Sequence, residues 1–310
     1  MASLVVWCGS LAGLLFWRRR LWNLVSDTTL IGPAIWGVVA WSAAGLSSLL
    51  SVGQPASDRD VGMFLAGCLT LCPTLAVWGA RRPHQIAWNW IVLSLWCVLV
   101  LPAAGVVLGR PVQLHVARQW FLTGLVALTW LHYLPTAFRW SHTALAAAQV
   151  LLLAPYLPWP DAELVQRVVR QLQGNSEARS LLLGMLVLAA IWGLQRGLPD
   201  RSQRSRFDRA WLDYRDLFGA LWALRASERV NAVGRSLGGS FRLNWEGFRW
   251  TASGRASERA SERASDHASD AARDAERDMT CEVCLRGILR RFVDRNWLLV
   301  RGFASDGEGD

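Results

Sequence analysis

The sequence predicts an all-α polytopic membrane helix bundle of about seven spans, followed by a small cytoplasmic α+β tail. Hydrophobic residues make up 52% of the 310 residues, and the mean hydropathy is +0.21. They are concentrated in the first two thirds of the chain, in runs close to the roughly 17–25 helical residues that cross a bilayer. Many of the 19 tryptophans lie near the ends of these runs, where their amphipathic rings prefer the headgroup level. Together these observations indicate a protein that crosses a membrane several times.

Seven apolar runs are candidate spans. The first run and the last two are short for a full crossing, so six spans remain an alternative. Small residues recur within the runs and allow helix backbones to approach closely. The candidate spans are Ala2–Trp17, Leu30–Val52, Val61–Ala80, Trp88–Gly109, Trp120–Phe138, Thr143–Trp159 and Leu181–Gln195.

Arginine predicts the orientation of these spans, because basic residues near span ends are retained on the cytoplasmic side. Clusters follow the first, third, fifth and seventh runs, at Arg18–Arg20, Arg81–Arg82, Arg139 and Arg196–Arg206. We therefore expect the N-terminus outside and the C-terminus in the cytoplasm. Six other arginines oppose this orientation: Arg59, Arg110, Arg118, Arg167, Arg170 and Arg179.

Lysine is absent from the chain, and all 33 basic residues are arginine, a bias typical of GC-rich bacterial genomes. The expected location is therefore a bacterial cytoplasmic (inner) membrane, with the lipid bilayer as the first partner. Without lysine the bundle cannot hold retinal as a Schiff base, so a rhodopsin-like function is excluded.

Four parts are expected along the chain. Residues 1–196 form the bundle, residues 197–250 an amphipathic helix and a strand, residues 251–279 a low-complexity linker, and residues 280–310 a helix with an acidic end. The linker repeat "RASERASERASDHASD" is too polar to bury a core. Between the sixth and seventh spans, Pro160–Asn175 predicts an amphipathic helix on the outer membrane surface.

The tail begins with an aromatic stripe at helical spacing, opposite a face of Arg and Asp. Its basic start and aromatic side chains fit attachment to the anionic lipids of the cytoplasmic leaflet, or to a protein partner. The alternative is that the stripe packs on the tail itself, because such stripes are ordinary core faces. The candidate interaction face consists of Phe207, Trp211, Tyr214, Phe218 and Trp222.

Two shorter patterns follow in the tail. Phe241, Leu243 and Trp245 alternate with polar residues, which predicts a half-buried strand that needs a partner in the tail or in another protein. Cys281 and Cys284 form a CxxC pair where a helix is expected to begin, a position that lowers a thiol pKa. A redox site would need a preceding strand and a zinc site a second ligand pair, so we expect neither a metal nor a cofactor here.

His132 is the one ionisable side chain, apart from Tyr and Cys, that we expect well inside a span. Such a group is a functional candidate by default. It would lie about 10 Å from the cytoplasmic end, at 1.5 Å per residue. One interpretation is a neutral histidine bonded within the bundle. The other is a cytoplasm-facing pocket for an anionic headgroup or ligand, formed by His132, His84, His142, Arg81, Arg82 and Arg139.

The segments "FDRAWLDYRDLFGALWALRASERVNAVGR" and "LRGILRRFVDRNWL" resemble the tails of uncharacterised multi-pass membrane proteins from bacteria. The resemblance implies a family without implying a reaction. We expect a non-catalytic scaffold or assembly partner that acts through its tail and binds no nucleic acid. A permease or transport subunit is the alternative, although the spans lack the carboxylates that ion-driven carriers use. A haem-linked electron-transfer subunit is a third possibility.

Overall fold

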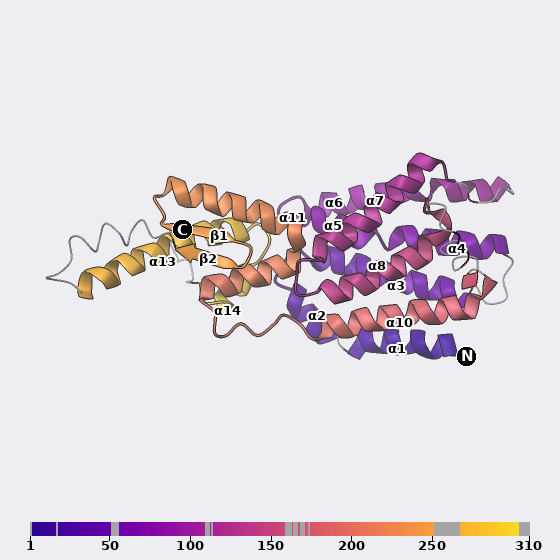
Figure 1. The fold of residues 1–310 in the computed structure, drawn as a ribbon, viewed down its shortest axis with the longest axis horizontal. Coiled ribbons are helices and arrows are strands. Elements are labelled where there is room, and N and C mark those ends of the chain that lie inside the picture. The colour runs from indigo at the N-terminus through magenta and orange to yellow at the C-terminus, as the bar shows by residue number, and fades with distance from the viewer. Residues whose placement is uncertain are drawn as a thin grey trace. The chain divides into compact units, whose positions relative to one another are not determined.

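The computed structural model describes residues 2–16, 18–50, 56–108, 112, 114–158, 174–250 and 267–303, with isolated positions between 163 and 172. The described chain is mostly helical, with a single two-stranded sheet (Figure 1). It divides into two compact units, Met1–Gly197 and Leu198–Asp310. The expected helix at Pro160–Asn175, most of the linker and the acidic end fall largely outside the described residues.

The first unit is a helical bundle. Its elements are α1 (Ala2–Phe16), α2 (Arg18–Val25), α3 (Ile31–Leu50), α4 (Ala56–Leu69), α5 (Cys72–Trp78), α6 (Gln85–Val100), the 3-10 helix η1 (Leu101–Leu108), α7 (Val116–Tyr133), α8 (Arg139–Leu153), the 3-10 helix η2 (Ala154–Tyr156) and α10 (Ser176–Gln195).

The long helices of this unit lie side by side and run back and forth (Figure 1). α1 runs parallel to α10, because Val6 lies against Gly184 at one level and Gly13 against Ile191 at the next. The Thr29 hydroxyl, just before α3, donates to the Ala80 carbonyl, just after α5, at 2.7 Å. These contacts set α1 parallel to α10 and place the start of α3 beside the end of α5.

Four segments are long and apolar enough to cross a membrane: Ile31–Leu50, Val61–Trp78, Ile86–Gly105 and Ser176–Gln195. They fall on the second, third, fourth and seventh runs predicted as spans. α1 and α8 have only 15 residues each. α7 begins with the polar residues Arg118 and Gln119 in its first turn. The structure therefore supports a membrane-type bundle with four candidate spans, and the count of seven stays a prediction.

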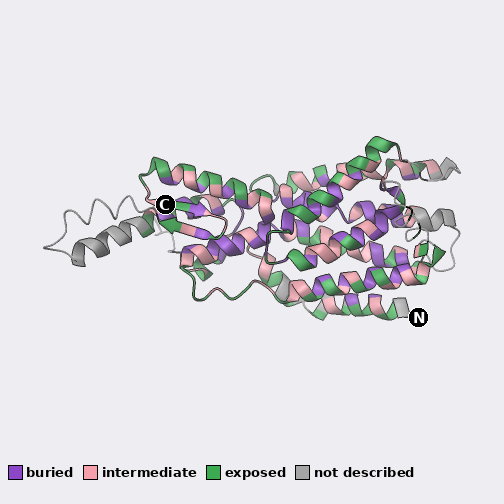
Figure 2. Cartoon of the chain, in the orientation of Figure 1, coloured by how far each residue is buried: buried purple, intermediate pink, exposed green. Residues whose placement is uncertain are grey.

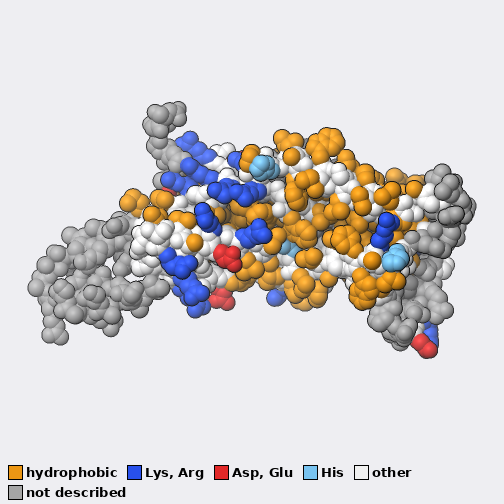
Figure 3. All heavy atoms as spheres, turned by 90° about the horizontal axis from the view of Figure 1, so that it is seen from above, with side chains coloured by type: hydrophobic (Ala, Val, Ile, Leu, Met, Phe, Trp, Pro, Cys, Tyr) orange, Lys and Arg blue, Asp and Glu red, His pale blue; other side chains and the backbone are white. Residues whose placement is uncertain are grey.

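Large apolar side chains are exposed on the outer surface of the bundle: Figure 2 marks exposed positions along its helices, and Figure 3 shows hydrophobic side chains over the visible face. At least half of the side-chain-bearing residue is exposed at each of five positions: Ile35, Val38, Trp90, Phe121 and Trp192. A surface of this kind suits a lipid environment, because water-soluble monomers rarely expose wide apolar patches.

Close helix packing in the bundle depends on glycine at two positions. A Cβ at Gly45 would lie 2.6 Å from the Trp7 ring, and one at Gly184 would lie 2.7 Å from Val6. Gly45 of α3 thus makes room for Trp7 of α1, and Gly184 of α10 makes room for Val6. The small residues noted in the sequence serve as contact points between helices.

The second unit contains α11 (Arg206–Ser236), β1 (Phe241–Asn244), β2 (Gly247–Trp250), α13 (His267–Leu289) and α14 (Arg295–Val300). Gly219 interrupts α11 with a φ of 75°, so that α11 consists of two helical halves (Figure 1). Glycine adopts this left-handed conformation without the steric cost of a Cβ. The break allows both halves to pack on the same core.

The two strands form an antiparallel hairpin in which Leu243 faces Phe248. The α11 side chains satisfy the outward backbone groups of both strands. Asn231 donates to the Leu243 carbonyl at 2.8 Å and accepts from its N–H at 2.7 Å. Asp208 accepts from the Phe248 N–H at 2.7 Å. The expected strand therefore has its partner within the tail, but it ends at Asn244, and Trp245 lies in the turn.

The aromatic stripe of the tail is the core of the second unit. Trp211, Tyr214 and Phe218 are fully buried. The rings of Tyr214 and Phe218 both meet Phe292 edge-on at 5.3 Å. Phe207 is buried as well, and Trp222 is half-buried against Phe292. The prediction that these side chains form an interaction face is therefore wrong. They pack within the tail itself, as the alternative interpretation expects.

Candidate functional site

The arginine clusters used to predict orientation lie at one end of the bundle, here called the basic end. Trp78 of α5 and His132 of α7 contact each other, with ring centroids 6.5 Å apart. Gly193 of α10 lies against Ser141 of α8. Since α1 runs parallel to α10, residues 18–20, Arg81, Arg82, Arg139 and Arg196 all emerge at this end.

Two histidines meet at the basic end around Tyr133. The Tyr133 ring stacks on His142, with centroids 3.6 Å apart and an interplanar angle of 6°. His132 meets the same ring edge-on at 4.7 Å. His132 and Tyr133 are buried in the last turn of α7, while His142 is half-buried in the first turn of α8. The His132–Tyr133–His142 cluster is thus a compact aromatic group at a helix–helix turn.

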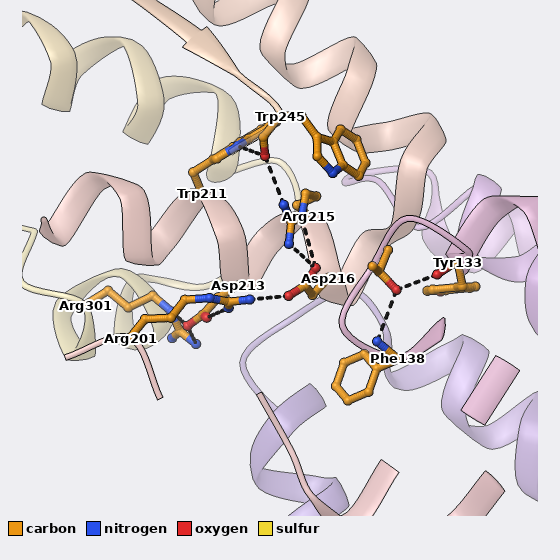
Figure 4. Close-up of polar contacts among 10 residues, drawn as sticks. Tyr133, Phe138, Arg201, Trp211, Asp213, Arg215, Asp216, Trp245 and Arg301 are labelled. Atoms are coloured by element: carbon orange, nitrogen blue, oxygen red, sulfur yellow. Dashed lines mark hydrogen bonds and ion pairs between the residues drawn. The ribbon is translucent and has the colours of Figure 1, made fainter. Parts of the chain in front are cut away.

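The turn between these two helices ends α7 earlier than expected. α7 stops at Tyr133, and the Thr136 hydroxyl stabilises the turn, donating to the Tyr133 carbonyl at 2.7 Å and accepting from the Phe138 N–H at 3.3 Å (Figure 4). Pro135 therefore follows the helix and does not kink it. The expected helix reaching Phe138 is therefore wrong, and His132 lies in the last turn of α7.

The six residues expected to form an anion pocket are brought together only in part. The structure joins His132 and His142 through Tyr133. Arg81, Arg82, His84 and Arg139 are exposed at the same end, on the α5–α6 turn and at the start of α8. The guanidinium of Arg139 lies over the Trp140 ring at 5.5 Å. The result is a positively charged rim beside an aromatic cluster.

Two buried polar side chains in the bundle were not expected from the sequence. Arg179 is 3% exposed in the first turn of α10, at the end of the bundle opposite the basic end. Gln149 of α8 is 2% exposed, and its amide donates to the Thr70 carbonyl at 2.7 Å. Thr70 lies at the break between α4 and α5, where Pro73 follows. The Gln149 amide therefore satisfies a carbonyl that a continuous helix would have bonded.

Replacing Gln149 by leucine should destabilise the bundle by about 1–3 kcal/mol, because the Thr70 carbonyl would stay buried without its donor. The labelling rate of the buried Cys72 thiol by a maleimide, in the full chain in nanodiscs, reports this change. Ser94→Ala on α6 is the control. Its exposed hydroxyl bonds only the Trp90 carbonyl of its own helix, so labelling should not change. Unchanged Cys72 labelling in Gln149→Leu would contradict the prediction.

The second unit contains a buried network of charged side chains that joins segments far apart in the sequence (Figure 4). Arg201 pairs with Asp216 and, at 2.6 Å, with Asp213. Arg215 pairs with Asp216 at 2.8 Å, and Arg301 pairs with Asp213 at 2.9 Å. Burial lowers the pKa of Arg301, and the neighbouring Asp213 carboxylate opposes that shift. The network connects α11 to residues before and after it.

Arginines at the basic start of the tail also form ion pairs within this unit. Arg201 belongs to the buried network, and Arg206 pairs with Glu282 of α13 at 3.1 Å. Attachment of the tail to anionic lipid stays a prediction, and these contacts add a role within the unit for Arg201 and Arg206. Their charges are already matched by carboxylates of the same unit.

The CxxC pair lies within a helix. α13 starts at His267, inside the segment expected as a linker, so Cys281 and Cys284 are far from its first turn. Both thiols are buried, and burial raises the pKa of each. The expected lowering by a helix N-terminus is therefore wrong, and the two cysteines act as small apolar core side chains. Within the described ranges, no group of three or more His, Cys, Asp or Glu is placed to hold a metal ion.

Comparison of the chain with family models, with curated proteins and with solved structures found no match. The fold and these sites define its class: a helical bundle with four membrane-length apolar helices, joined to a separately folded α+β unit.

Proposed function

We propose that the chain is a multi-pass protein of a bacterial inner membrane, with seven crossings, its N-terminus outside and its second unit in the cytoplasm. The observation that carries this proposal is the common position of the arginine clusters at the basic end. Positive residues near span ends remain on the cytoplasmic side, and seven alternating passes place the two ends of the bundle on opposite sides.

Cysteine accessibility in intact cells tests the orientation. His115 lies at the end opposite the basic end, and Ser202 lies in the second unit; both are exposed. In a chain with Cys8 and Cys97 replaced by serine, His115→Cys should react with a membrane-impermeant maleimide added outside. Ser202→Cys should react only after permeabilisation. The reverse pattern, or outside labelling at both positions, contradicts the orientation.

We propose further that the protein is a non-catalytic membrane scaffold that acts through its second unit. This unit has its own core and joins the bundle at the basic end, where it is accessible to cytoplasmic partners. Its buried charged groups pair with each other, as expected for groups that stabilise a fold. Deleting Phe207–Phe303 should release a specific partner from the purified complex, while the bundle stays inserted. An unchanged set of co-purified components would contradict the scaffold.

A permease is a second candidate, favoured by the break between α4 and α5. Interrupted helices with buried polar groups are common at transporter binding sites, and Gln149 lies against this break. If the protein is a permease, Gln149→Ala should abolish uptake of a solute that the parent chain transports, with insertion unchanged. Equal uptake by the two chains would remove this candidate.

A further inference from the structure

The second half of α11 exposes arginines next to leucines. Leu221 and Leu224 are 38% and 55% exposed, and Arg225 and Arg229 on the same helical face are exposed as well. Glu228 lies between the two arginines on this face. The exposed parts of the two leucines, together with the arginines beside them, form a surface that is both apolar and positively charged.

A second basic segment adjoins this face. The Trp222 ring packs on Phe292 with centroids 4.9 Å apart, and the Arg225 guanidinium lies 6.0 Å above the Trp222 ring. Arg290 and Arg291, which directly precede Phe292 in the α13–α14 turn, are exposed. We call the combined surface, Leu221, Leu224, Arg225, Arg229, Arg290 and Arg291, the arginine–leucine face. Among the described residues, the face carries four positive side chains, and the adjoining Glu228 carries one negative charge.

We propose that the arginine–leucine face docks on the anionic lipid surface of the membrane in which the bundle lies. The positive charges of the face complement an anionic leaflet. Each arginine near such a surface strengthens attachment about fivefold. Leucines beside the arginines suit the boundary between headgroups and acyl chains, whereas most contacts to nucleic acid are hydrogen bonds from charged and polar groups to phosphate and sugar. This docking rests on the proposed crossing of the membrane by α10.

The covalent connection to the bundle makes weak attraction sufficient. Residues 196–205 link the end of α10 to the start of α11. Once α10 crosses the bilayer, the second unit stays near the lipid surface, and docking becomes an intramolecular equilibrium. The face can therefore hold the unit on the membrane with few contacts, and a modest change in lipid charge shifts the docked fraction.

An environment-sensitive fluorophore on Leu224→Cys tests the docking in the full chain, with Cys8 and Cys97 replaced by serine. In nanodiscs of phosphatidylcholine and phosphatidylglycerol, emission should shift to shorter wavelength relative to nanodiscs of phosphatidylcholine alone. High salt should reverse the shift. Adding Arg225→Gln and Arg291→Gln should lower the equilibrium constant for docking by about 25-fold, at about fivefold per arginine. A label on Arg249→Cys, exposed on β2, is the control and should not respond.

The absence of a shift with phosphatidylglycerol would overturn the docking, and so would an equal shift in both lipids. A shift only after addition of duplex DNA would overturn it in favour of a nucleic-acid surface. Both faces of a nanodisc carry the same lipid, so the result does not depend on orientation. The outcome of this experiment is therefore independent of the cysteine labelling in intact cells, which tests the orientation of the chain.

Discussion

Replacing Asp216 by alanine should lower the free energy of unfolding of the second unit by about 3–5 kcal/mol. Asp216 is fully buried and pairs with both Arg201 and Arg215. Without its carboxylate, two guanidinium groups stay in an environment poor in water, with one fewer negative charge to balance them. Removing one partner of a buried ion pair costs far more than removing an exposed pair, because the remaining charge keeps its desolvation penalty.

Thiol labelling measures this effect in the intact chain. Cys281 is fully buried in the core of the second unit, so it reacts with a maleimide only when that unit opens. Asp216→Ala should raise its labelling rate by at least a hundredfold, and peptide mass spectrometry identifies the site. Glu246→Ala is the matched control. It removes an exposed ion pair to Arg249 at 4.0 Å, which contributes about 0–1 kcal/mol. Equal rates in the two variants would show that the network does not stabilise the unit.

Trp211→Ala should destabilise the second unit by a similar amount, about 3–5 kcal/mol. The Trp211 ring is fully buried beside Tyr214, and its indole N–H donates to the Trp245 carbonyl at 3.4 Å. Alanine would leave a cavity between α11 and the hairpin. Cys281 labelling and denaturant unfolding both report the loss.

Trp250→Ala provides the comparison for Trp211, because Trp250 belongs to the same unit but is 48% exposed. Its loss should cost much less stability. The pair of variants also separates the two interpretations of the aromatic stripe. If the stripe were a membrane-facing surface, Trp211→Ala would weaken lipid attachment and leave Cys281 protected.

The apolar runs predicted the positions of the four membrane-length helices, because burial in lipid demands a long run of apolar residues that is visible in the sequence. Helix ends were predicted less well. The end of α7 at Tyr133 depends on the Thr136 hydroxyl and Pro135, which lie inside an apolar run and leave no change in hydropathy. The break at Thr70 is likewise stabilised by Gln149, a residue that is distant in sequence.

At the candidate site, too, contacts between residues distant in sequence could not be predicted. The positions of the arginine clusters, at alternate span ends, could be predicted because alternation follows from connectivity alone. The stacking of Tyr133 on His142 could not, because it depends on how two helices turn at Thr136. In the tail, helical spacing predicted an amphipathic stripe but not what covers it. The covering residues, among them Phe292 and Phe248, follow the stripe by many residues, and sequence periodicity carries no information on such distant contacts.

The contacts of Arg301 and Phe303 also determine when this protein finishes folding during its synthesis. Arg301 pairs with Asp213, and the Phe303 ring packs against Phe207 at 5.9 Å. When the ribosome has translated α11 and the hairpin, the residues that close the unit have not yet been made. The second unit completes its core only after translation has passed Phe303. A nascent chain stalled before that point would leave Trp211 and Phe207 open to chaperones and proteases.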